Sequence, residues 1–425
     1  MNKNNIKATI SILLLFGFLI LRITSLSYAD SAEVLPKGVF SLGAEYKYYF
    51  KIDERYNPDG NVEDVAIDYN ATLDSSIFSD LSLLEPFMPP GQIPNIGKSV
   101  VSFDYYYKIT EFTFMYGVTD RLSVGIMIPY WWVKNEVKAK LDTSKATVGK
   151  SSIGTGFGMP LVPLAGGGPF GDAVPLVKED VQDLLGKGLD VNNDGIIDIS
   201  GFGYKRFETW SDSGVGDIDV EFRYQYLKTA NWRLAFTGGV RIPTGQITDP
   251  DSLVDRPLGT GAYALLFRLN NDYTGIKNLV LNATVRYDLY LPAKETLRIP
   301  DDVNRPITTN KEEVDRNIGD VIELEASGKY DLFKGFSLSA LYKFGFAQKD
   351  RVSGNRGFAY ESLELETNYT EHVYIIGLSY STIPLFLEKK FPFPLTASIS
   401  YRNRFAGSNN ALRSQYIGFG IQAFF

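Results

Sequence analysis

Cysteine is absent from this chain of 425 residues, and histidine occurs once, at position 372. The lack of cysteine excludes disulfide bonds, cysteine-ligated metal sites and thiolate catalysis. Long apolar runs are also missing after residue 29, so no later stretch is long enough to form a transmembrane helix. If this chain crosses a membrane, it has to cross with strands.

The first 29 residues have the features of a secretory signal peptide. Lys3 and Lys7 flank a polar start, residues 8–21 are almost wholly apolar, and residues 27–29 supply the small residues of a cleavage site. The apolar run is shorter than the roughly 20 residues of a spanning helix. We therefore predict cleavage after Ala29, with a retained anchor as the alternative. Cleavage lowers the formal net charge from -7 to about -10. This negative charge disfavours nucleic acid as a partner.

The remaining residues alternate with a period of two over long segments. Aromatic residues make up 14% of the chain, which favours strands. In residues 39–50 the even positions are apolar and the odd positions are mostly polar, and residues 217–226 share this parity. Residues 279–291 alternate with the odd positions apolar and the even positions mostly polar. Strands of soluble sandwiches are usually about five or six residues long, whereas a tilted membrane-spanning strand needs about ten. The alternation therefore predicts an all-β fold, a transmembrane antiparallel up-and-down β-barrel.

We count about twelve such segments, with ten or fourteen as alternatives. They lie near residues 39–50, 100–118, 121–133, 216–227, 232–243, 259–269, 279–291, 319–331, 335–347, 372–383, 394–405 and 414–425. Short links, including residues 119–120, 228–231, 270–278, 332–334 and 384–393, alternate with longer ones, as periplasmic turns and external loops do. Because the aromatic residues of the second segment change from odd to even positions, we expect a bulge near residues 108–111.

The last residues predict the location of the barrel. Ile417, Phe419, Ile421, Ala423 and Phe425 alternate up to the terminal phenylalanine. This pattern resembles the C-terminal signal that the barrel-assembly machinery reads in outer-membrane proteins. We therefore expect this machinery and outer-membrane lipid as partners, and the outer membrane of a Gram-negative bacterium as the location.

Charged residues fall on the polar face of the strands, which has to point into the barrel. Lipid exposure would cost roughly 2 to 4 kcal/mol for each Arg or Lys near the midplane. The predicted lumen-lining residues are Asp217, Asp219, Glu221, Arg223, Arg233, Arg241, Arg268, Arg286, Glu323, Glu325, Lys343, Arg402 and Arg404. Two interpretations stay open: ion pairs that brace a narrow barrel, or a polar channel that orients a permeant solute.

Two long insertions, near residues 51–99 and 134–215, interrupt the barrel that we expect over residues 30–425. The first holds apolar residues between Ile77 and Met88 and predicts a short amphipathic helix that covers or enters the mouth. The second holds an apolar, glycine-rich stretch over residues 154–168. Because exposed loops normally avoid such a stretch, it should pack against other loops or form an entry site for a hydrophobic ligand.

An Asp-rich motif in the second insertion resembles a calcium-binding loop. Asp190, Asn192, Asp194 and Asp198 offer oxygen ligands, Ile196 offers its backbone carbonyl, and position six of the loop is glycine, as in an EF-hand. Gly201 stands where the loop needs a bidentate glutamate, so Glu208 or water would have to complete the coordination. Calcium is the predicted cofactor, and an Asx-rich turn is the alternative.

Catalysis is the weakest hypothesis for this chain. His372 is the sole histidine, and its neighbours lack the serine and asparagine of the outer-membrane phospholipase motif. A Ser–His pair elsewhere would make a hydrolase, but a polar residue at the outer end of a strand is the simpler interpretation. No catalytic residue is predicted.

Four motifs resemble the family of outer-membrane transporters named for the meta pathway of phenol degradation. They are residues 35–38, residues 116–122 continuing through 128–130, residues 214–217 and residues 241–245. The resemblance implies uptake of small, often aromatic or hydrophobic solutes, although the insert after Lys134 departs from the family pattern. An adhesin or structural barrel whose loops bind another surface is the alternative function. Channel conductance would separate the two.

Overall fold

The computed structural model describes residues 31–151, 159–165 and 173–425. The predicted signal peptide lies outside these residues. Among the described helices, none is long and apolar enough to cross a membrane.

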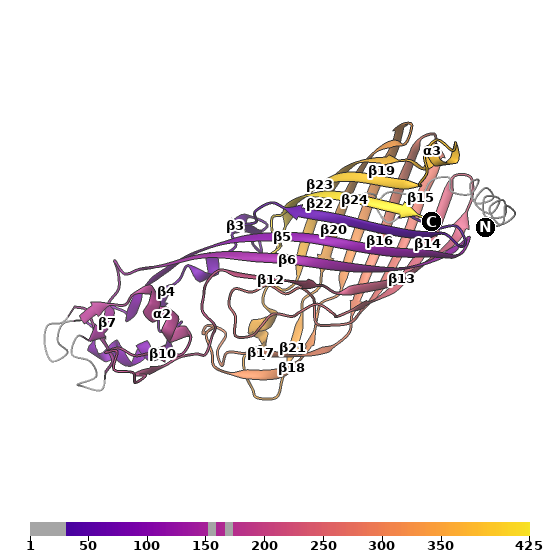
Figure 1. Ribbon diagram of the computed structural model, residues 1–425. Helices are drawn as coiled ribbons and strands as arrows, with labels where there is room; N and C mark the ends of the chain where they lie inside the picture. Colours follow the sequence, from indigo (N-terminus) through magenta and orange to yellow (C-terminus); the bar gives the residue numbers. More distant parts are fainter. Residues whose placement is uncertain (1–30, 152–158, 166–172) are drawn as a thin grey trace, which may run out of the picture.

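Twelve antiparallel strands form a closed barrel, which confirms the predicted fold class and strand count (Figure 1). The strands are β1 (Phe40–Tyr49), β5 (Asn95–Thr119), β6 (Leu122–Asp142), β13 (Ile218–Lys228), β14 (Trp232–Ile242), β15 (Ala264–Ile276), β16 (Leu279–Tyr290), β19 (Val321–Phe333), β20 (Phe336–Ala347), β22 (Tyr369–Ser381), β23 (Leu395–Gly407) and β24 (Gln415–Phe424). They pair in chain order, and β1 closes the ring between β24 and β5. Phe40 and Phe425 exchange two backbone hydrogen bonds at this closure.

The β15–β16 connection is shorter than the sequence suggested. We expected a link over residues 270–278, but β15 continues to Ile276 and the turn is tight. The reason is that Asn270 and Asp272 are fully buried on the inner face of the strand. Polar residues near a strand end were mistaken for a turn because their partners come from distant parts of the chain.

The expected bulge in β5 is wrong. β5 pairs with β6 without interruption from Lys98 to Gly117. Odd positions point inward along the whole strand, so buried Phe103 and Tyr105 face inward while exposed Phe112 and Phe114 face outward. The aromatic residues change face because the part of β5 that holds Phe112 and Phe114 is apolar toward lipid. The part that holds Phe103 and Tyr105 is apolar toward a protein core.

The outer wall of the barrel is apolar. Exposed side chains on it include Phe40, Leu42, Phe112, Phe114, Val124, Ile126, Val220, Phe222, Phe267, Leu269, Leu281, Val285, Leu324, Leu338, Ile376, Leu378, Ile399, Phe419 and Ile421. Trp232 is exposed near the turn end, and the rings of Tyr130 and Trp132 touch on the other side. An apolar belt edged with aromatic rings is the surface that a membrane covers.

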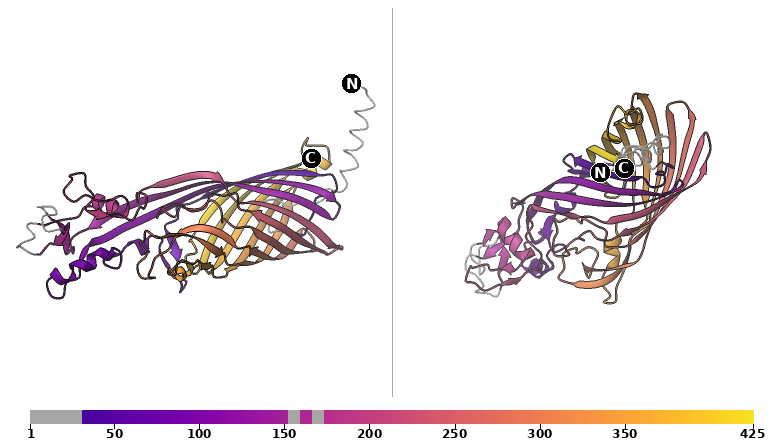
Figure 2. Two further views of the ribbon diagram at one scale, coloured as in Figure 1. Left: turned by 90° about the horizontal axis from the view of Figure 1, so that it is seen from below. Right: turned by 45° about the vertical axis from the view of Figure 1, so that its right-hand side comes forward.

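β5 and β6 are roughly twice as long as a spanning strand, and they carry a separate unit away from the barrel (Figure 2). This distal unit contains β4 (Thr72–Asp74), η2 (Ser79–Phe87), β7 (Val148–Ser151), β8 (Leu161–Pro163), β9 (Ala173–Pro175), α2 (Lys178–Leu185), β10 (Gly188–Leu189) and β11 (Ile199–Ser200). It has its own core of buried side chains, namely Leu73, Phe78, Leu81, Leu84, Ile96, Val148, Leu161, Leu176, Leu184, Leu189 and Val191.

The distal unit changes the interpretation of both insertions. The predicted helix forms as η2, but Leu81 and Leu84 bury into the distal core, so η2 does not cover the barrel mouth. Packing between loops is confirmed for Leu161 and Met159 of the second apolar stretch. Residues 152–158 and 166–168 of that stretch lie outside the described chain.

The remaining elements surround the external end of the barrel. They are β2 (Glu54–Tyr56), β3 (Val62–Asp64), η1 (Ile67–Tyr69), β12 (Trp210–Val215), β17 (Ala293–Arg298), β18 (Lys311–Asn317), β21 (Arg351–Ser353) and η3 (Tyr360–Glu364). α3 (Ile383–Leu387) lies at the opposite end, beside the C-terminus (Figure 1). The long loops and the C-terminus therefore lie at opposite ends of the barrel.

Candidate functional site

A belt of ion pairs runs around the inside of the barrel. Arg241 on β14 forms a two-point pair with Asp219 on β13, at 2.8 and 2.9 Å. Arg268 on β15 reaches across β14 to Glu221, at 2.7 and 2.8 Å. Gly239 of β14 lies opposite Glu221 and has no side chain, so Arg268 has room to cross β14.

The belt continues through the following strands. Arg286 on β16 contacts Glu323 and Glu325 on β19, each at 3.4 Å. Lys343 on β20 bridges Glu323 at 2.5 Å and Glu371 on β22 at 2.8 Å. The ion pairs thus link charged side chains from β13 through β22, either between neighbouring strands or across one strand.

Glu371 and Tyr416 complete the belt along the last strands of the barrel, where these strands meet β1 and β5. Arg404 on β23 contacts Glu371 at 2.6 Å, and Arg402 lies 3.8 Å from it. The ring of Tyr416 on β24 lies between Arg402 and Lys47, whose cations are 5.8 and 5.9 Å from its centroid. Lys47 then pairs with Glu111 on β5 at 2.5 Å. Buried charges are tolerated here because they are paired.

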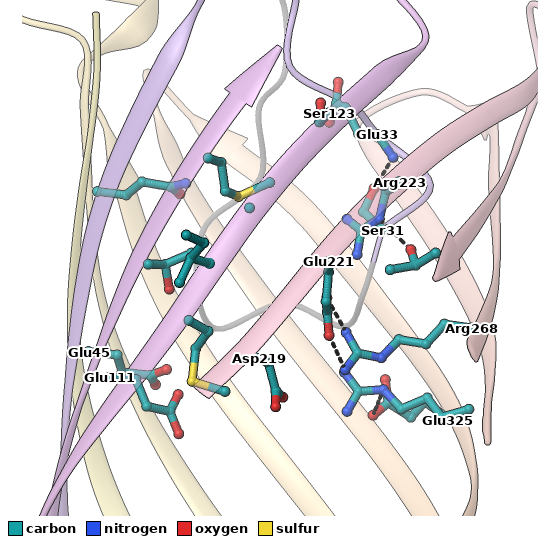
Figure 3. A pocket seen from close by; sticks show the side chains of 18 of the residues that line it. Ser31, Glu33, Glu45, Glu111, Ser123, Asp219, Glu221, Arg223, Arg268 and Glu325 are labelled. Atoms are coloured by element: carbon teal, nitrogen blue, oxygen red, sulfur yellow. Dashed lines mark hydrogen bonds and ion pairs between the residues drawn. The ribbon is translucent and has the colours of Figure 1, made fainter. Parts of the chain in front are cut away.

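The belt encloses a cavity of about 550 Å³ (Figure 3). Glu221, Arg268 and Glu325 lie on the right of the view in Figure 3, Glu45 and Glu111 lie on the left, and Asp219 lies between them. Apart from Glu111, the wall formed by β5 and β6 is uncharged toward the cavity and presents Thr113, Met115, Ser123, Gly125 and Met127. The cavity is therefore amphipathic, with an uncharged strip along part of a charged ring.

The segment from Ser31 to Lys37 closes the end of the barrel that carries the short turns; we call it the N-terminal segment. Ser31 donates a hydrogen bond to Asp272 at 2.7 Å, and the carbonyl of Ala32 accepts one from Gln225 at 2.7 Å. Ser123 accepts a hydrogen bond from the backbone of Leu35 at 2.8 Å. These partners lie on β6, β13 and β15, and Leu35 belongs to the same buried apolar cluster as Phe424 of β24, so the segment crosses the opening.

Glu33 and Arg233 form the ionic contact of the N-terminal segment, at 3.0 Å. Arg233 also contacts Asp272 at 3.0 Å, and the Asp272 side chain is completely buried. Burial raises the pKa of Glu33 to about 7; Arg233 opposes the rise and Asp272 adds to it. Two carboxylates thus share one guanidinium, which makes this contact sensitive to pH near neutrality.

The family motifs meet at the two rims of the barrel. At the turn rim, Gly38 donates a hydrogen bond to the Gly117 carbonyl at 2.8 Å, and a side chain on Gly117 would come within 2.0 Å of the Pro36 carbonyl oxygen. At the external rim, Thr244 donates to the carbonyl of Gly216 at 2.6 Å. Residues that looked like generic turns therefore hold the N-terminal segment and the external loops in place.

The predicted lumen residues are found on the inner face. Those that line the cavity are Asp219, Glu221, Arg223, Arg241, Arg268, Arg286, Glu325, Lys343 and Arg402. The other four flank it. Asp217 binds the backbone of Gly245 and Thr260 at the external rim, and Arg233 binds the N-terminal segment. Glu323 and Arg404 belong to the ion-pair belt but do not line the cavity.

Sequence reasoning missed several residues of this site. Glu45, Lys47 and Glu111 belong to the polar sets of β1 and β5, and Glu371 occupies an inward position of β22. Strict application of the alternation would have found them. The contacts of Ser31 and Glu33 have no signal in the sequence, because a short segment before the first strand shows no periodicity.

The Asp-rich motif adopts a turn that is held by its own side chains. Asp190 accepts hydrogen bonds from the backbone of Gly195 at 2.8 Å and Asp194 at 3.2 Å, and Asp198 accepts one from Val191 at 2.8 Å. In the part of the chain that the structure describes, no group of three or more His, Cys, Asp or Glu side chains is placed to hold a metal ion. The calcium site predicted from Asp190, Asn192, Asp194, Ile196 and Asp198 stays a prediction.

His372 lies among aromatic side chains on β22. Its Nδ1 is 2.7 Å from the Tyr342 hydroxyl, and its ring packs near Phe344 and Phe405. These are the contacts of an outward-facing aromatic cluster.

Comparisons with known proteins agree with this architecture. The family described as "Putative MetA-pathway of phenol degradation" matches residues 170–365, which confirms the resemblance. No curated protein sequence matches the chain. The crystal structure of an outer membrane channel from Pseudomonas putida F1 aligns with 95% of this chain and 100% of that one, at 12% identity and a TM-score of 0.50.

Two further crystal structures align more loosely. The toluene transporter of Ralstonia pickettii covers 92% of this chain and 90% of its own, at 11% identity and a TM-score of 0.36. A homologue of the FadL channel from Pseudomonas aeruginosa covers 92% and 90%, at 9% identity and a TM-score of 0.33. The barrel and its apolar belt belong to an outer-membrane protein.

Proposed function

We propose that this chain, whose residues 170–365 match the MetA-pathway family, is an outer-membrane channel for small apolar or aromatic solutes. One observation carries the proposal: a cavity of about 550 Å³ lies inside the barrel, and the N-terminal segment, rather than a filled core, closes it. A structural barrel would gain nothing from a hollow lined with charges that need partners.

The ion-pair belt makes the cavity wall rigid and leaves little uncompensated charge. A small inorganic ion therefore finds few free groups to coordinate it, whereas an apolar solute can follow the uncharged strip that includes Met115 and Met127. Methionine side chains adapt to ligands of different shape and contact aromatic rings favourably. The family description names phenol degradation, which agrees with aromatic solutes.

The N-terminal segment is the movable part of this proposal. It is held by a few hydrogen bonds and one ion pair, whereas each barrel strand is paired on both sides along its length. Displacing it exchanges those contacts for water and opens the cavity toward the turn side. Conduction therefore depends on this segment.

A pair of engineered cysteines tests the gate, since the chain has no others. In Ser31→Cys with Asp272→Cys, oxidation should lock the segment and reduction should release it. We expect conductance and uptake of radiolabelled phenol in proteoliposomes to rise on reduction, while the single variant Ser31→Cys should not respond. Equal conductance in both states would reject the gate, and no conductance or phenol uptake in either would reject the channel.

Recognition by the distal unit is a second candidate function. It has its own core and lies at the far ends of β5 and β6, away from the barrel, which suits a unit that binds another molecule. We further propose that the turn at residues 190–198 in this unit binds calcium weakly, since all four side chains of the motif already accept backbone hydrogen bonds within this turn.

A further inference from the structure

A cationic side chain at the external mouth lacks the partner that every cation of the belt has. Arg256 lies in the loop between β14 and β15, with its guanidinium carbon 4.2 Å from the centroid of the Tyr105 ring. Its Nε is buried and has no hydrogen-bond partner, and no carboxylate of the described residues forms an ion pair with it. Burial lowers the pKa of Arg256; Tyr69 opposes this shift, and nearby Arg55 adds to it by repulsion.

The nearby groups are already engaged elsewhere. Asp255 accepts a hydrogen bond from the backbone of Asp249 through one carboxylate oxygen at 2.7 Å, while its Oδ1 is buried without a partner and forms no ion pair with Arg256. Arg55 is neutralised by Glu63 and Asp68, each at 2.8 Å. An uncompensated guanidinium in a partly buried position is costly, so an anion that reaches it gains a strong interaction.

Aromatic rings connect Arg256 to the cavity. Tyr416 and Tyr49 line the cavity, with ring centroids 4.9 Å apart, and Tyr107 lies 6.1 Å from Tyr49. From Tyr107 the path branches to Tyr105 at 6.4 Å, under Arg256, and to Trp131 at 6.3 Å. These spacings suit edge and offset contacts with a further ring.

Two hydrogen-bond donors on this path are also unused. The hydroxyl of Tyr105 is buried without a partner, and so is the Nε1 of Trp131. Buried donors of this kind are rare and normally find an acceptor. They lie on the same inner face of β5 and β6 that the loop of Arg256 covers, where Asn135 binds the carbonyl of Val254 at 2.8 Å.

We propose that the external mouth selects aromatic anions, with Arg256 and the unused donors taking the carboxylate and the half-buried rings of Tyr107 and Tyr49 contacting the ring of the solute. The inference rests on the proposed channel and narrows its solute class to arene carboxylates. A neutral arene gains only the ring contacts, and an aliphatic anion gains only the charge.

Calorimetry on the purified full chain in detergent tests the site with three probes at neutral pH: benzoate, benzyl alcohol and cyclohexanecarboxylate. We expect benzoate to bind most tightly and Arg256→Gln to weaken it by about tenfold, the effect of losing one charged hydrogen bond. Binding of benzyl alcohol should not change in that variant. Arg413→Gln is the matched control, since Arg413 is an exposed external cation paired with Glu54, and it should leave benzoate binding intact.

Equal benzoate affinity of wild type and Arg256→Gln would overturn the proposal, and equal affinity for benzoate and cyclohexanecarboxylate would overturn its aromatic part. If Arg256→Gln does not fold, Tyr105→Phe provides the second variant; it removes only the unused hydroxyl, keeps the buried ring and should lower benzoate affinity selectively. These binding results are independent of the cysteine lock. A conducting protein that does not bind benzoate rejects this inference alone, whereas a protein that conducts in neither state rejects the channel.

Discussion

Arg241 and Asp219 face each other on neighbouring strands and form a two-point ion pair inside the barrel, at 2.8 and 2.9 Å. Asp219 is 2% exposed, so almost no water can replace its partner. The pair supports the bracing interpretation of the charged interior. The cavity beside it supports the channel interpretation, and the two roles share the same residues.

Removing one partner should therefore reduce stability more than it changes selectivity. We expect Arg241→Ala to lower the free energy of unfolding by about 3 kcal/mol, because Asp219 is left buried and unpaired. The double variant Arg241→Met with Asp219→Leu should recover much of this loss. Melting curves and reversal potentials in a salt gradient measure the two effects. A shift toward cation selectivity with unchanged melting would show that Arg241 lines the path without bracing it.

The release of the N-terminal segment should depend on pH through Glu33. Its pKa is about 7 in the seated segment and roughly 4.3 when hydrated, so the seated state binds the proton more tightly. The free energy that holds the N-terminal segment in the barrel is therefore largest below about pH 4. It falls by at most roughly 1.4 kcal/mol per pH unit as the pH rises toward 7, and it is constant above pH 7. Hydrogen exchange of residues 31–37, corrected for intrinsic rates, should report the change. Glu33→Gln should abolish it, and parallel pH profiles in both proteins would contradict the assignment.

A methyl group at Gly117 should displace the N-terminal segment without altering its sequence. The added carbon would lie 2.0 Å from the Pro36 carbonyl oxygen, so the segment has to move. We expect Gly117→Ala to raise single-channel conductance. The matched control is Gly328→Ala on β19, where the added carbon meets only Leu281 at 3.6 Å. Unchanged conductance in a folded Gly117→Ala protein would mean that the segment closes nothing.

The closed barrel should resist unfolding by detergent. With β1 bonded to both β24 and β5, the sheet has no free edge from which to unravel. Unboiled protein should migrate anomalously on a denaturing gel and shift on heating. A helical circular-dichroism spectrum would contradict the barrel.

Calcium binding by the Asp-rich turn should be weak, in the range of about 0.1 to 1 mM that extracellular modules show. Asp190→Ala and Asp194→Ala should each remove the heat of binding in calorimetry. Glu208→Ala tests whether that residue completes the coordination. Absence of any calcium heat, with no protection of the loop from protease, would leave only the turn.

The sequence by itself determined the barrel, its strand number and the inner position of its charges. Alternation is local, and a strand with lipid on one side has to place Arg241 or Arg286 on the other. The same rule predicted the exposed outer residues such as Phe419 and Ile421. It overlooked Glu371 only because the surrounding strand was counted from the next residue.

Tertiary structure alone decided which charges are neutralised and what closes the cavity. Glu33 finds Arg233, and Leu35 finds Ser123, across separations that no local pattern encodes. The absence of an ion-pair partner for Arg256 could not be predicted from the sequence either. It becomes visible only when the positions of all the acidic side chains around this loop arginine are known. Pairing of this kind depends on which strands the closure of the barrel brings together, and that is a property of the whole chain.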